Sequence, residues 1–553
     1  MYDARLLQTD GYIMRLLQFM TARRTWQTSH LLALVVLFIT LLGNVAFFRH
    51  AGAVYFPQNV PFILALGLVL LALNYFVLGL FCYRVTLKPI AAVILLLSAV
   101  VAYHMDTFDV VIDKVMLQNV VQTQTAEALD LFTPKFLLYL LVLGVLPTWW
   151  LLRQKIERTS LKRGFWLKFK WMGLALLLVA LCGGVFNKSV ASFAREQKAV
   201  RFYTNPLTYL YSAGQFVGNH FSSQTRNFQA IALDAKISES DNDKELMIMV
   251  VGETVRADHW SLNGYGKNTN PLMSQEANFV SLSNFNSCGT STAVSVPCMF
   301  TNLGRVNYSD KKFNNTENAL DVLKRSGVQI LWRDNNSSSK GVADRVAYED
   351  YRSNKRNPMC EGECRDEGML VGLQEYINQN ADKDILIVLH TMGNHGPAYF
   401  KRYPKQFEKF TPACQDNQLE NCSAESISNA YDNAILYTDY VLSQIIQLLK
   451  ANEAKYETSM IYMSDHGESL GEKGVYLHGM PYMIAPDAQK YPAAGIWVGR
   501  DFNGVAVDKL KQVASQPLSH DHLFHTLLGA FEVQTQAYRP ELDIYHLAGS
   551  DKP

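Results

Sequence analysis

The chain has 553 residues, which is enough for about three average domains. Its formal net charge is +1 and it has no basic or acidic tail, so the composition gives no indication of a nucleic-acid partner. The informative feature is an asymmetry along the chain. Long apolar runs fill the part before Asn187, and the remainder has the mixed composition of a globular domain.

Five apolar runs in the first part predict membrane spans. A helix needs roughly 17–25 mostly apolar residues to cross a bilayer, so the third and fifth runs, which are short, require flanking residues. A cleaved signal peptide is not indicated, because the first run starts late and no small-residue cleavage site follows it. The predicted spans are Leu31–Phe48, Phe62–Phe81, Pro89–Tyr103, Phe136–Leu152 and Trp171–Phe186.

Basic residues predict the orientation of these spans. They cluster before the first span, between the second and third, and between the fourth and fifth. With five spans all three clusters fall on one face of the membrane, which the positive-inside rule makes cytoplasmic. Everything after Asn187 is then expected on the opposite, extracytoplasmic face.

The segment "VIDKVMLQNVVQTQTAEALDLF", between the third and fourth spans, predicts an amphipathic helix lying on the membrane interface. Asn119, Thr123 and Glu127 are spaced by four residues, which places them on one stripe of such a helix. From the residues alone, the default interpretation of this stripe is a solvated polar face.

Cysteine usage agrees with an extracytoplasmic domain. Two cysteines, Cys82 and Cys182, lie in predicted spans, where a thiol is a small apolar filler. The other six form sequence-local pairs, a pattern typical of disulfides in an oxidising compartment. For the pair in "CEGEC" a zinc knuckle is the competing interpretation, although no second pair is suitably spaced. The six are Cys288, Cys298, Cys360, Cys364, Cys414 and Cys422.

Residues 188–243 are expected to form a connector with an interfacial helix, since "RFYTNPLTYLYSAGQF" carries aromatic residues that suit a membrane interface. From Lys244, short β-rich runs alternate with amphipathic helical stretches. The runs "ELMIMVVGET", "VQILWRDNN", "DILIVLHTMGNHG", "SMIYMSDHGES" and "GIWVGRD" each predict a strand that ends in polar residues. This alternation indicates an α/β domain over residues 244–553 with a mostly parallel sheet, in which sites form at the carboxyl ends of strands.

Three residues at predicted strand ends are candidate metal ligands. Glu253 follows "MIMVV" and a glycine, and Asp465 and His466 follow "MIYM" and a serine. Each alone could be an ordinary loop residue. Burying a carboxylate and an imidazole without partners is costly, however, and a divalent cation would remove that cost. Zinc accepts both kinds of ligand.

The stretch "SCGTSTAVSVPC", residues 287–298, sets two threonines and two serines between two cysteines. A threonine hydroxyl is a poor nucleophile at neutral pH, and metal coordination is one way to activate it. A disulfide between the cysteines would hold the turn so that one hydroxyl points at the metal. The alternative is a loop stapled for stability, which composition alone favours.

Two further histidines lie in glycine-rich turns, His395 in "GNHGP" and His478 in "LHGMP". Together with Lys340 in "SSSKG" they could bind an anionic group or a second metal. Each could instead be a plain turn residue.

Six motifs in order resemble those of the lipid A phosphoethanolamine transferases, which include the mobile colistin-resistance enzymes of Gram-negative bacteria. The motifs are "VGETVRADHWSLNGYGKNTNP", "SCGTSTAVSVPCMF", "LWRDNNSSSKG", "HTMGNHGP", "SDHGESLGE" and "YLHGMPY". The resemblance covers the whole chain and implies five transmembrane helices over residues 1–187 and a periplasmic zinc-dependent catalytic domain of alkaline-phosphatase/sulfatase type over residues 244–553. One departure is that "CEGEC" brings its two cysteines closer together than the corresponding family pair.

The resemblance also implies roles for individual residues. Thr292, and not Thr290, matches the family's nucleophile, because it lies four residues after Cys288, the first cysteine of the stretch "SCGTSTAVSVPC". The family's zinc ligands match Glu253, Thr292, Asp465 and His466, and the residues around the transferred group match Lys340, His395 and His478. A substrate-binding triad matches Asn119, Thr123 and Glu127.

The function expected from the resemblance is a two-step transfer at the bacterial inner membrane. Zinc activates Thr292, which takes phosphoethanolamine from phosphatidylethanolamine and passes it to a phosphate of lipid A. The added positive charge would weaken binding of cationic peptides such as polymyxin. One tight zinc site is expected, a second during turnover is left open, and a monomer is expected because the globular part has no long apolar heptads.

Four alternatives differ in what they require. A related transferase would act on core sugars or another envelope glycan, and the motifs say little about the acceptor. A sulfatase would need a C/S-x-P-x-R sequence for its modified nucleophile, which is not found at the strand end. A simple phosphatase would not need five spans, and a membrane-anchored binding module would leave Thr292 dispensable.

Overall fold

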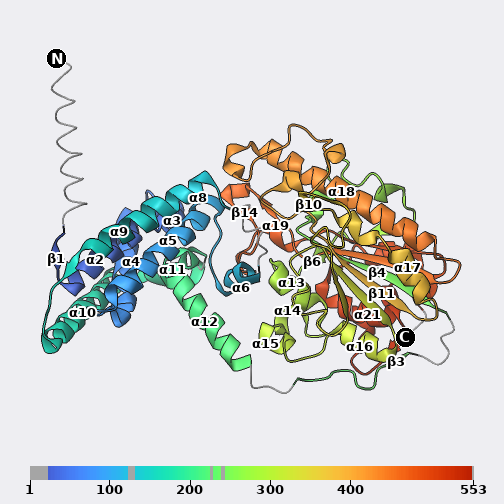
Figure 1. The fold of residues 1–553 in the computed structure, drawn as a ribbon, viewed down its shortest axis with the longest axis horizontal. Helices are drawn as coiled ribbons and strands as arrows, with labels where there is room; N and C mark the ends of the chain where they lie inside the picture. Colours follow the sequence, from blue (N-terminus) through green and yellow to red (C-terminus); the bar gives the residue numbers. More distant parts are fainter. Residues whose placement is uncertain (1–22, 123–130, 198, 224–227, 238–242, 551–553) are drawn as a thin grey trace, which may run out of the picture. The chain divides into compact units, whose positions relative to one another are not determined.

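The structure is a computed structural model that describes residues 23–122, 131–197, 199–223, 228–237 and 243–550 (Figure 1). Within these ranges the chain forms two compact units. The first runs up to Lys114 and from Phe132 to Gly214. The second contains the segment from Val115 and the residues from Gln215 onward. The expected domain boundaries near residues 187 and 243 remain predictions.

Apolar helices build the first unit. Among the described residues, four are long and apolar enough to cross a membrane, or five if the pair α2 and α3, which is bent by 56°, counts as one span. The second count equals the number of spans expected from the sequence. The helices are α2 (Thr28–Leu42), α3 (Val45–Tyr55), α4 (Val60–Phe81), α5 (Leu87–Phe108), the run of α8 (Pro134–Tyr139), a π-helical turn (Leu140–Val145) and α9 (Leu146–Arg153), then α10 (Leu161–Val185), α11 (Asn187–Glu196) and α12 (Leu207–Ser223).

Three of these helices, α4, α8 and α10, begin at side-chain caps. The Asn59 side chain accepts a hydrogen bond from the backbone of Phe62 at the start of α4, and Thr133 does the same for Phe136 at α8. Both helices have a proline in the first turn, where its missing N–H is not needed. The caps satisfy backbone N–H groups that a helix end otherwise leaves without a partner.

The fifth helix is longer than its apolar run. The run Trp171–Phe186 requires flanking residues to complete a span, and α10 supplies them on one side, since it begins at Leu161 and includes the basic residues from Lys162 to Lys170. Lysine and arginine are good helix formers, so the helix continues where hydropathy falls. Hydropathy therefore marks the apolar part of this helix and not its start.

The bend between α2 and α3 is held by a buried pair of asparagines. The Asn44 side chain donates to the carbonyls of Ile39 (2.9 Å) and Asn205 (2.8 Å). The Asn205 side chain in turn donates to the carbonyls of Gly43 (2.8 Å) and Ser98 (3.0 Å). A broken helix inside an apolar unit needs such partners for its freed backbone groups.

A seven-stranded sheet forms the centre of the second unit, in the order β5-β15-β12-β4-β11-β7-β8. The five strands from β12 to β8 run parallel, and β15 and β5 pair antiparallel at one edge. The mostly parallel sheet expected from the sequence is therefore confirmed. The strands are β4 (Glu245–Gly252), β5 (Phe279–Ser281), β7 (Gln329–Asp334), β8 (Ala347–Asp350), β11 (Ile385–His390), β12 (Glu457–Ser464) and β15 (Ala494–Val498).

Helices cover both faces of this sheet (Figure 1). Strand β4 is buried along its whole length, and its alternate residues enter two separate apolar cores. One core includes residues of α16 (Ala319–Ser326) and α21 (Leu523–Ala530), and the other includes residues of α17 (Leu373–Gln379) and the long α18 (Ala424–Lys450). Because β4 lies between two layers of helices, its carboxyl end is held firmly in place.

Helix α6 (Lys114–Gln122) is the described part of the amphipathic segment expected from the sequence. Thr123 and Glu127 lie outside the described residues. The contacts of α6 place most of it, from Val115, in the second unit, with the sheet.

Candidate active site and metal centre

The predicted metal ligands lie at the carboxyl ends of two neighbouring strands, β4 and β12. Ser464 at the end of β12 pairs in parallel register with Gly252 at the end of β4. The next residues, Asp465 and Glu253, therefore emerge side by side at the carboxyl edge of the sheet. His466 follows directly, and all three ligand residues have fully buried side chains.

The three side chains converge on one point. His466 Nε2 lies 3.2 Å from Asp465 Oδ2 and 3.5 Å from Glu253 Oε1. One ligand atom from each residue falls within 4.8 Å of the other two. The Thr292 hydroxyl donates to Glu253 Oε2 at 3.1 Å, so the fourth predicted ligand reaches the same place.

The protonation pattern of this group fits a bound cation. His466 Nδ1 donates to the carbonyl of Gly467 at 2.9 Å, and burial lowers the pKa of His466 well below its usual range, so the ring is neutral. Its Nε2 then presents a lone pair toward the carboxylates. Neither His466 Nε2 nor Asp465 Oδ2 has a hydrogen-bond partner among the described residues. Converging acceptors are repulsive without a cation, and this donor set is one that zinc accepts.

The segment that contains Thr292 is held so that one hydroxyl faces this centre. Thr292 is the first residue of α13 (Thr292–Met299) and lies within the loop that the disulfide Cys288–Cys298 closes. The Thr290 hydroxyl instead donates to the carbonyl of Met480 at 2.5 Å. Of these two threonines, therefore, only Thr292 is placed against Glu253. The positive end of the α13 dipole also lies at Thr292, where it favours negative charge.

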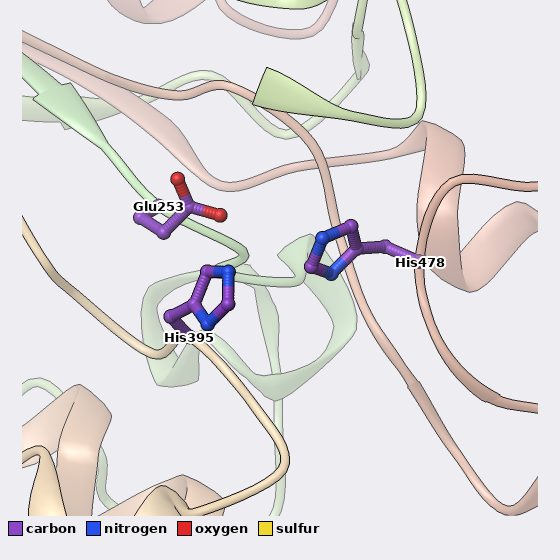
Figure 2. A group of neighbouring side chains, drawn as sticks. All are labelled: Glu253, His395 and His478. Atoms are coloured by element: carbon purple, nitrogen blue, oxygen red, sulfur yellow. The ribbon is translucent and has the colours of Figure 1, made fainter. Parts of the chain in front are cut away.

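A second group of ligand atoms adjoins the first. Glu253, His395 and His478 point toward a common space, with one ligand atom from each lying within 4.8 Å of the others (Figure 2). The rings of His395 and His478 have centroids 5.4 Å apart, and the centroid of the His466 ring is 4.3 Å from that of His478. Burial lowers the pKa of His395 well below its usual range, and the nearby charge of Lys340 contributes in the same direction. The structure thus brings His395 and His478 together beside Glu253, while Nζ of Lys340 donates to the carbonyl and hydroxyl of Ser337.

Several residues that support this site were not expected from the sequence. Asn336, after β7, donates from Nδ2 to Glu253 Oε2 and to the carbonyl of Thr391, each at 2.8 Å. Glu468 Oε2 contacts Nδ1 of His478 at 2.7 Å. The strings "RDNN" and "SDHGES" mark both residues as strand-end polar groups, but nothing in them identifies the partner.

Glu468 is itself held by a buried hydroxyl. Tyr399 donates to Glu468 Oε1 at 2.7 Å, which leaves Oε2 for His478. Since a carboxylate accepts and does not donate, the His478 Nδ1 carries the proton. This arrangement fixes the tautomer of His478.

Helix α6 lies next to the His478 turn. A Cβ atom added at Gly479 would be 2.7 Å from the terminal methyl of Met116 and 3.6 Å from Nδ2 of Asn119. Gly479 also donates from its backbone to the carbonyl of Thr290 at 2.7 Å. Asn119 is therefore placed beside Gly479, whose backbone links the His478 turn to the segment that contains Thr292.

All three expected disulfides form, including Cys360–Cys364 and Cys414–Cys422. Cys360 and Cys364 close a short hairpin of β9 (Cys360–Glu361) and β10 (Glu363–Cys364), so they do not form a zinc knuckle. Glu363 in this hairpin pairs with Arg402, whose Nε donates to the carbonyl of His395 at 2.6 Å. The hairpin thus supports the turn that carries His395.

Two family models and several known proteins match this chain. The family model described as "Sulfatase" matches residues 245–533, and the one described as "Phosphoethanolamine transferase EptA/EptB" matches residues 70–221. The chain is 43% identical to "Phosphatidylethanolamine transferase Mcr-2" of Escherichia coli, covering 93% of this chain and 98% of that protein. It is 41% identical to "Phosphatidylethanolamine transferase Mcr-1" of Escherichia coli, covering 92% and 96% respectively.

One solved structure matches almost the whole chain. It is "Integral membrane protein lipooligosaccharide phosphoethanolamine transferase A (EptA) from Neisseria meningitidis", with a TM-score of 0.92 and 33% sequence identity. The match covers 96% of this chain and 100% of that one. The expected fold class, apolar helices followed by an α/β domain of alkaline-phosphatase/sulfatase type, is confirmed by these matches.

Proposed function

Because this chain belongs to the phosphoethanolamine transferase family, we propose that it transfers phosphoethanolamine from phosphatidylethanolamine to a phosphate of lipid A through a covalent intermediate on Thr292. The observation that carries the proposal is the Thr292 hydroxyl, which contacts Glu253 at the edge of a buried set of cation ligands. Phosphoryl transfer depends mostly on positioning and charge stabilisation, and this arrangement supplies both.

In the first step Thr292 is the nucleophile. Glu253, Asp465 and His466 would hold the zinc ion, which would supply Lewis-acid activation of the hydroxyl and of the phosphoryl oxygen. Thr292 loses its proton, its oxygen forms a bond to phosphorus, and the bond from phosphorus to the diacylglycerol oxygen breaks. The leaving diacylglycerol takes up a proton. The N-terminus of α13 stabilises negative charge as it develops at the threonine oxygen.

In the second step an oxygen of a lipid A phosphate forms the new bond to phosphorus. The bond to Thr292 breaks, and the threonine regains its proton. Lys340, His395 and His478 bind and orient the transferred group in both steps, and the contact with Glu468 keeps the His478 ring in place. Asn119 contributes to binding of the phosphatidylethanolamine headgroup, together with Thr123 and Glu127 of the same predicted helical stripe.

The apolar helices serve this chemistry because both substrates are lipids. We place them in the bacterial inner membrane, with the α/β domain in the periplasm, as the distribution of basic residues predicts. One tightly bound zinc is proposed, with Glu253, His395 and His478 able to hold a second during turnover. The chain is expected to act as a monomer. Added ethanolamine groups carry positive charge, so the modified surface binds polymyxin less well.

The alternative acceptor is a sugar of the lipopolysaccharide core or another envelope glycan. A related protein of Escherichia coli named "Kdo(2)-lipid A phosphoethanolamine 7''-transferase" is 27% identical over 479 residues. The two relatives at 43% and 41% identity are named for phosphatidylethanolamine, which specifies the donor and not the acceptor, so lipid A phosphate is proposed on the resemblance of the six sequence motifs.

Mass spectrometry of lipid A tests this proposal. Lipid A is extracted from cells that make this chain and from matched cells that make the Thr292→Ala variant. A gain of one phosphoethanolamine group that the variant lacks is the expected result. If lipid A were unmodified although the protein was folded and zinc-loaded, lipid A would be excluded as the acceptor. The phosphoethanolamine group would then be sought on core sugars. A gain that persists in the variant would refute the covalent mechanism.

A further inference from the structure

The residue after Glu253 has an unusual backbone conformation. Thr254 has a φ of +55°, in the left-handed region that β-branched residues rarely adopt. Its side chain is buried, and its hydroxyl has no hydrogen-bond partner among the described residues. The hydroxyl therefore contributes no hydrogen bond that would stabilise this conformation. Such strain persists only where the surrounding structure imposes it, and it gathers at functional sites.

The strained residue connects two of the predicted metal ligands. Thr254 directly follows Glu253, and its backbone N–H donates to Oδ1 of Asp465 at 3.2 Å. The next backbone N–H, of Val255, donates to Ser464 Oγ at 2.8 Å, and Ser464 directly precedes Asp465. If residue 254 rotated to an extended φ, the chain after it would turn away and this link between the two strand ends would be lost.

A single hydroxyl clamps both ends of this turn. Tyr431 donates from its hydroxyl to the carbonyl of Thr254 at 2.5 Å and accepts from the backbone N–H of Arg256 at 2.9 Å. Its backbone carbonyl accepts from Asn394 Nδ2 at 3.1 Å, and the Asn394 N–H donates to the carbonyl of Glu253 at 3.0 Å. Tyr431 thereby holds the loop after Glu253 directly and through Asn394.

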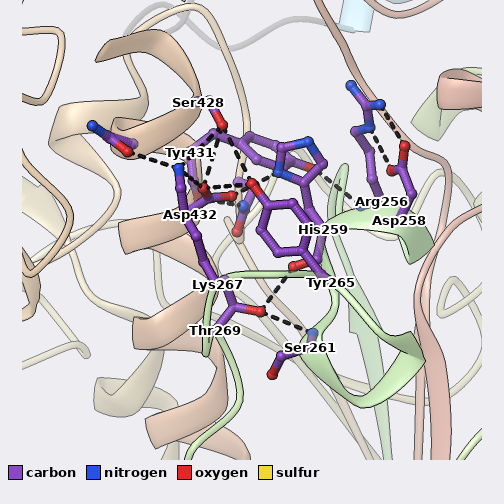
Figure 3. A network of polar contacts seen from close by, with 12 residues as sticks. Arg256, Asp258, His259, Ser261, Tyr265, Lys267, Thr269, Ser428, Tyr431 and Asp432 are labelled. Atoms are coloured by element: carbon purple, nitrogen blue, oxygen red, sulfur yellow. Dashed lines mark hydrogen bonds and ion pairs between the residues drawn. The ribbon is translucent and has the colours of Figure 1, made fainter. Parts of the chain in front are cut away.

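Tyr431 is itself fixed in place by α18 and the loop that follows Arg256 (Figure 3). Its ring packs edge-on against His259, with centroids 5.3 Å apart. The next residue on the helix, Asp432, contacts Nδ1 of His259 at 2.6 Å and accepts from Lys267 Nζ at 2.7 Å. These contacts tie the helix to the loop, so the hydroxyl of Tyr431 has little freedom to move.

We propose that Tyr431 is a positioning residue of the cation centre. Its hydroxyl keeps Thr254 in the left-handed conformation, and this holds the carboxylates of Glu253 and Asp465 in the relative positions that bind zinc and contact Thr292. The inference rests on the proposed function, since it assumes that these carboxylates bind the cation. It adds a residue of α18, which lies outside the sequence motifs that contain the proposed metal ligands, to the residues that position the site.

The test is zinc affinity of the purified full-length chain in detergent, measured by competition with a chromophoric chelator. Tyr431→Phe removes the hydroxyl and keeps the ring. We expect zinc affinity to fall by about 10- to 100-fold, as is usual when a group that orients a metal ligand is lost. Tyr456→Phe is the matched control, because Tyr456 is also buried and its hydroxyl has no hydrogen-bond partner among the described residues.

A double-mutant cycle isolates the role of the backbone. Glycine adopts the left-handed conformation without strain, so Thr254→Gly should make the hydroxyl of Tyr431 less necessary. In the Thr254→Gly background, Tyr431→Phe is expected to weaken zinc binding less than about 3-fold. The unfolding midpoint of the zinc-free variants serves as the check on folding.

The outcomes separate this inference from the proposed function. A wild-type chain that binds no zinc would refute the cation centre itself. A zinc-binding wild type with Tyr431→Phe equal to Tyr456→Phe would overturn the role of the hydroxyl alone. An equal loss with threonine and with glycine at residue 254 would overturn the role of the strained turn.

Discussion

Gly393 offers the sharpest test of how the site is packed. This residue has a φ of +49°, and an added Cβ atom would lie 2.8 Å from the carbonyl oxygen of Glu253 and 3.0 Å from its backbone nitrogen and Cβ. Neighbouring atoms of the backbone cannot move aside as the end of a flexible side chain can. Gly393→Ala should therefore displace Glu253, a proposed metal ligand, from its position.

The cost of this substitution follows from two contributions. A left-handed conformation costs a residue with a Cβ roughly 1–2 kcal/mol. Overpacking a tight site costs typically about 1–3 kcal/mol more. The sum is about 2–5 kcal/mol of stability, together with a loss of zinc affinity.

Gly474→Ala is the matched control. Gly474 has a φ of +80°, but an added Cβ would meet nothing within 4 Å, so this variant carries the backbone cost alone. The assay is the unfolding midpoint and the zinc affinity of both variants of the full-length chain. We expect Gly393→Ala to be lower in both. Equal midpoints and equal zinc affinities would refute the close packing of Gly393 on Glu253.

Three further predictions follow from the site and its surroundings. Removal of zinc with a chelator should abolish transfer and lower the unfolding midpoint, since a ligand at 100 times its Kd stabilises by about 2.7 kcal/mol; unchanged transfer by zinc-depleted protein would contradict this. Glu468→Gln should slow transfer to lipid A by about 10- to 100-fold while the fold is retained, because His478 loses its carboxylate partner, and a wild-type rate would count against that role. Burial raises the pKa of Asp543 from 3.8 to about 7, so its contribution to stability is fully present below pH 3.8 and is lost as the pH rises toward 7. The neutral Asp543→Asn should gain stability relative to the wild type by up to about 1.4 kcal/mol per pH unit across this window, and a pH-independent difference in denaturant unfolding would contradict the assignment.

The sequence predicts the centre of the site well, for a simple physical reason. Glu253 and Asp465 each directly follow a buried strand, and parallel neighbouring strands end at the same edge of a sheet. Once the alternation of strands and helices predicts a parallel sheet, the meeting of these residues follows. The placement of Thr292 against Glu253 required the resemblance to the family, because composition alone favours a stapled loop.

The supporting groups could not be predicted, since they come from contacts that no local pattern records. The hydroxyl of Tyr431 donates to the carbonyl of Thr254, which lies 177 positions away in the sequence. The helix that carries Tyr431 has an ordinary amphipathic pattern, so nothing in it indicates this contact. Likewise, Asn205 holds the bend at Asn44 across 161 positions, in a run whose hydropathy predicts one continuous span. The positive φ of Thr254 could not be predicted either, because sequence patterns indicate a positive φ at glycine and not at threonine.

The most direct test of the central claim is the intact mass of the purified chain after incubation with phosphatidylethanolamine and no acceptor, followed by peptide mapping. We expect a gain of one phosphoethanolamine group, located on Thr292 and absent both from Thr292→Ala and from zinc-depleted protein. A group on Thr290 or Ser291, or transfer to lipid A with no covalent adduct at any stage, would contradict it.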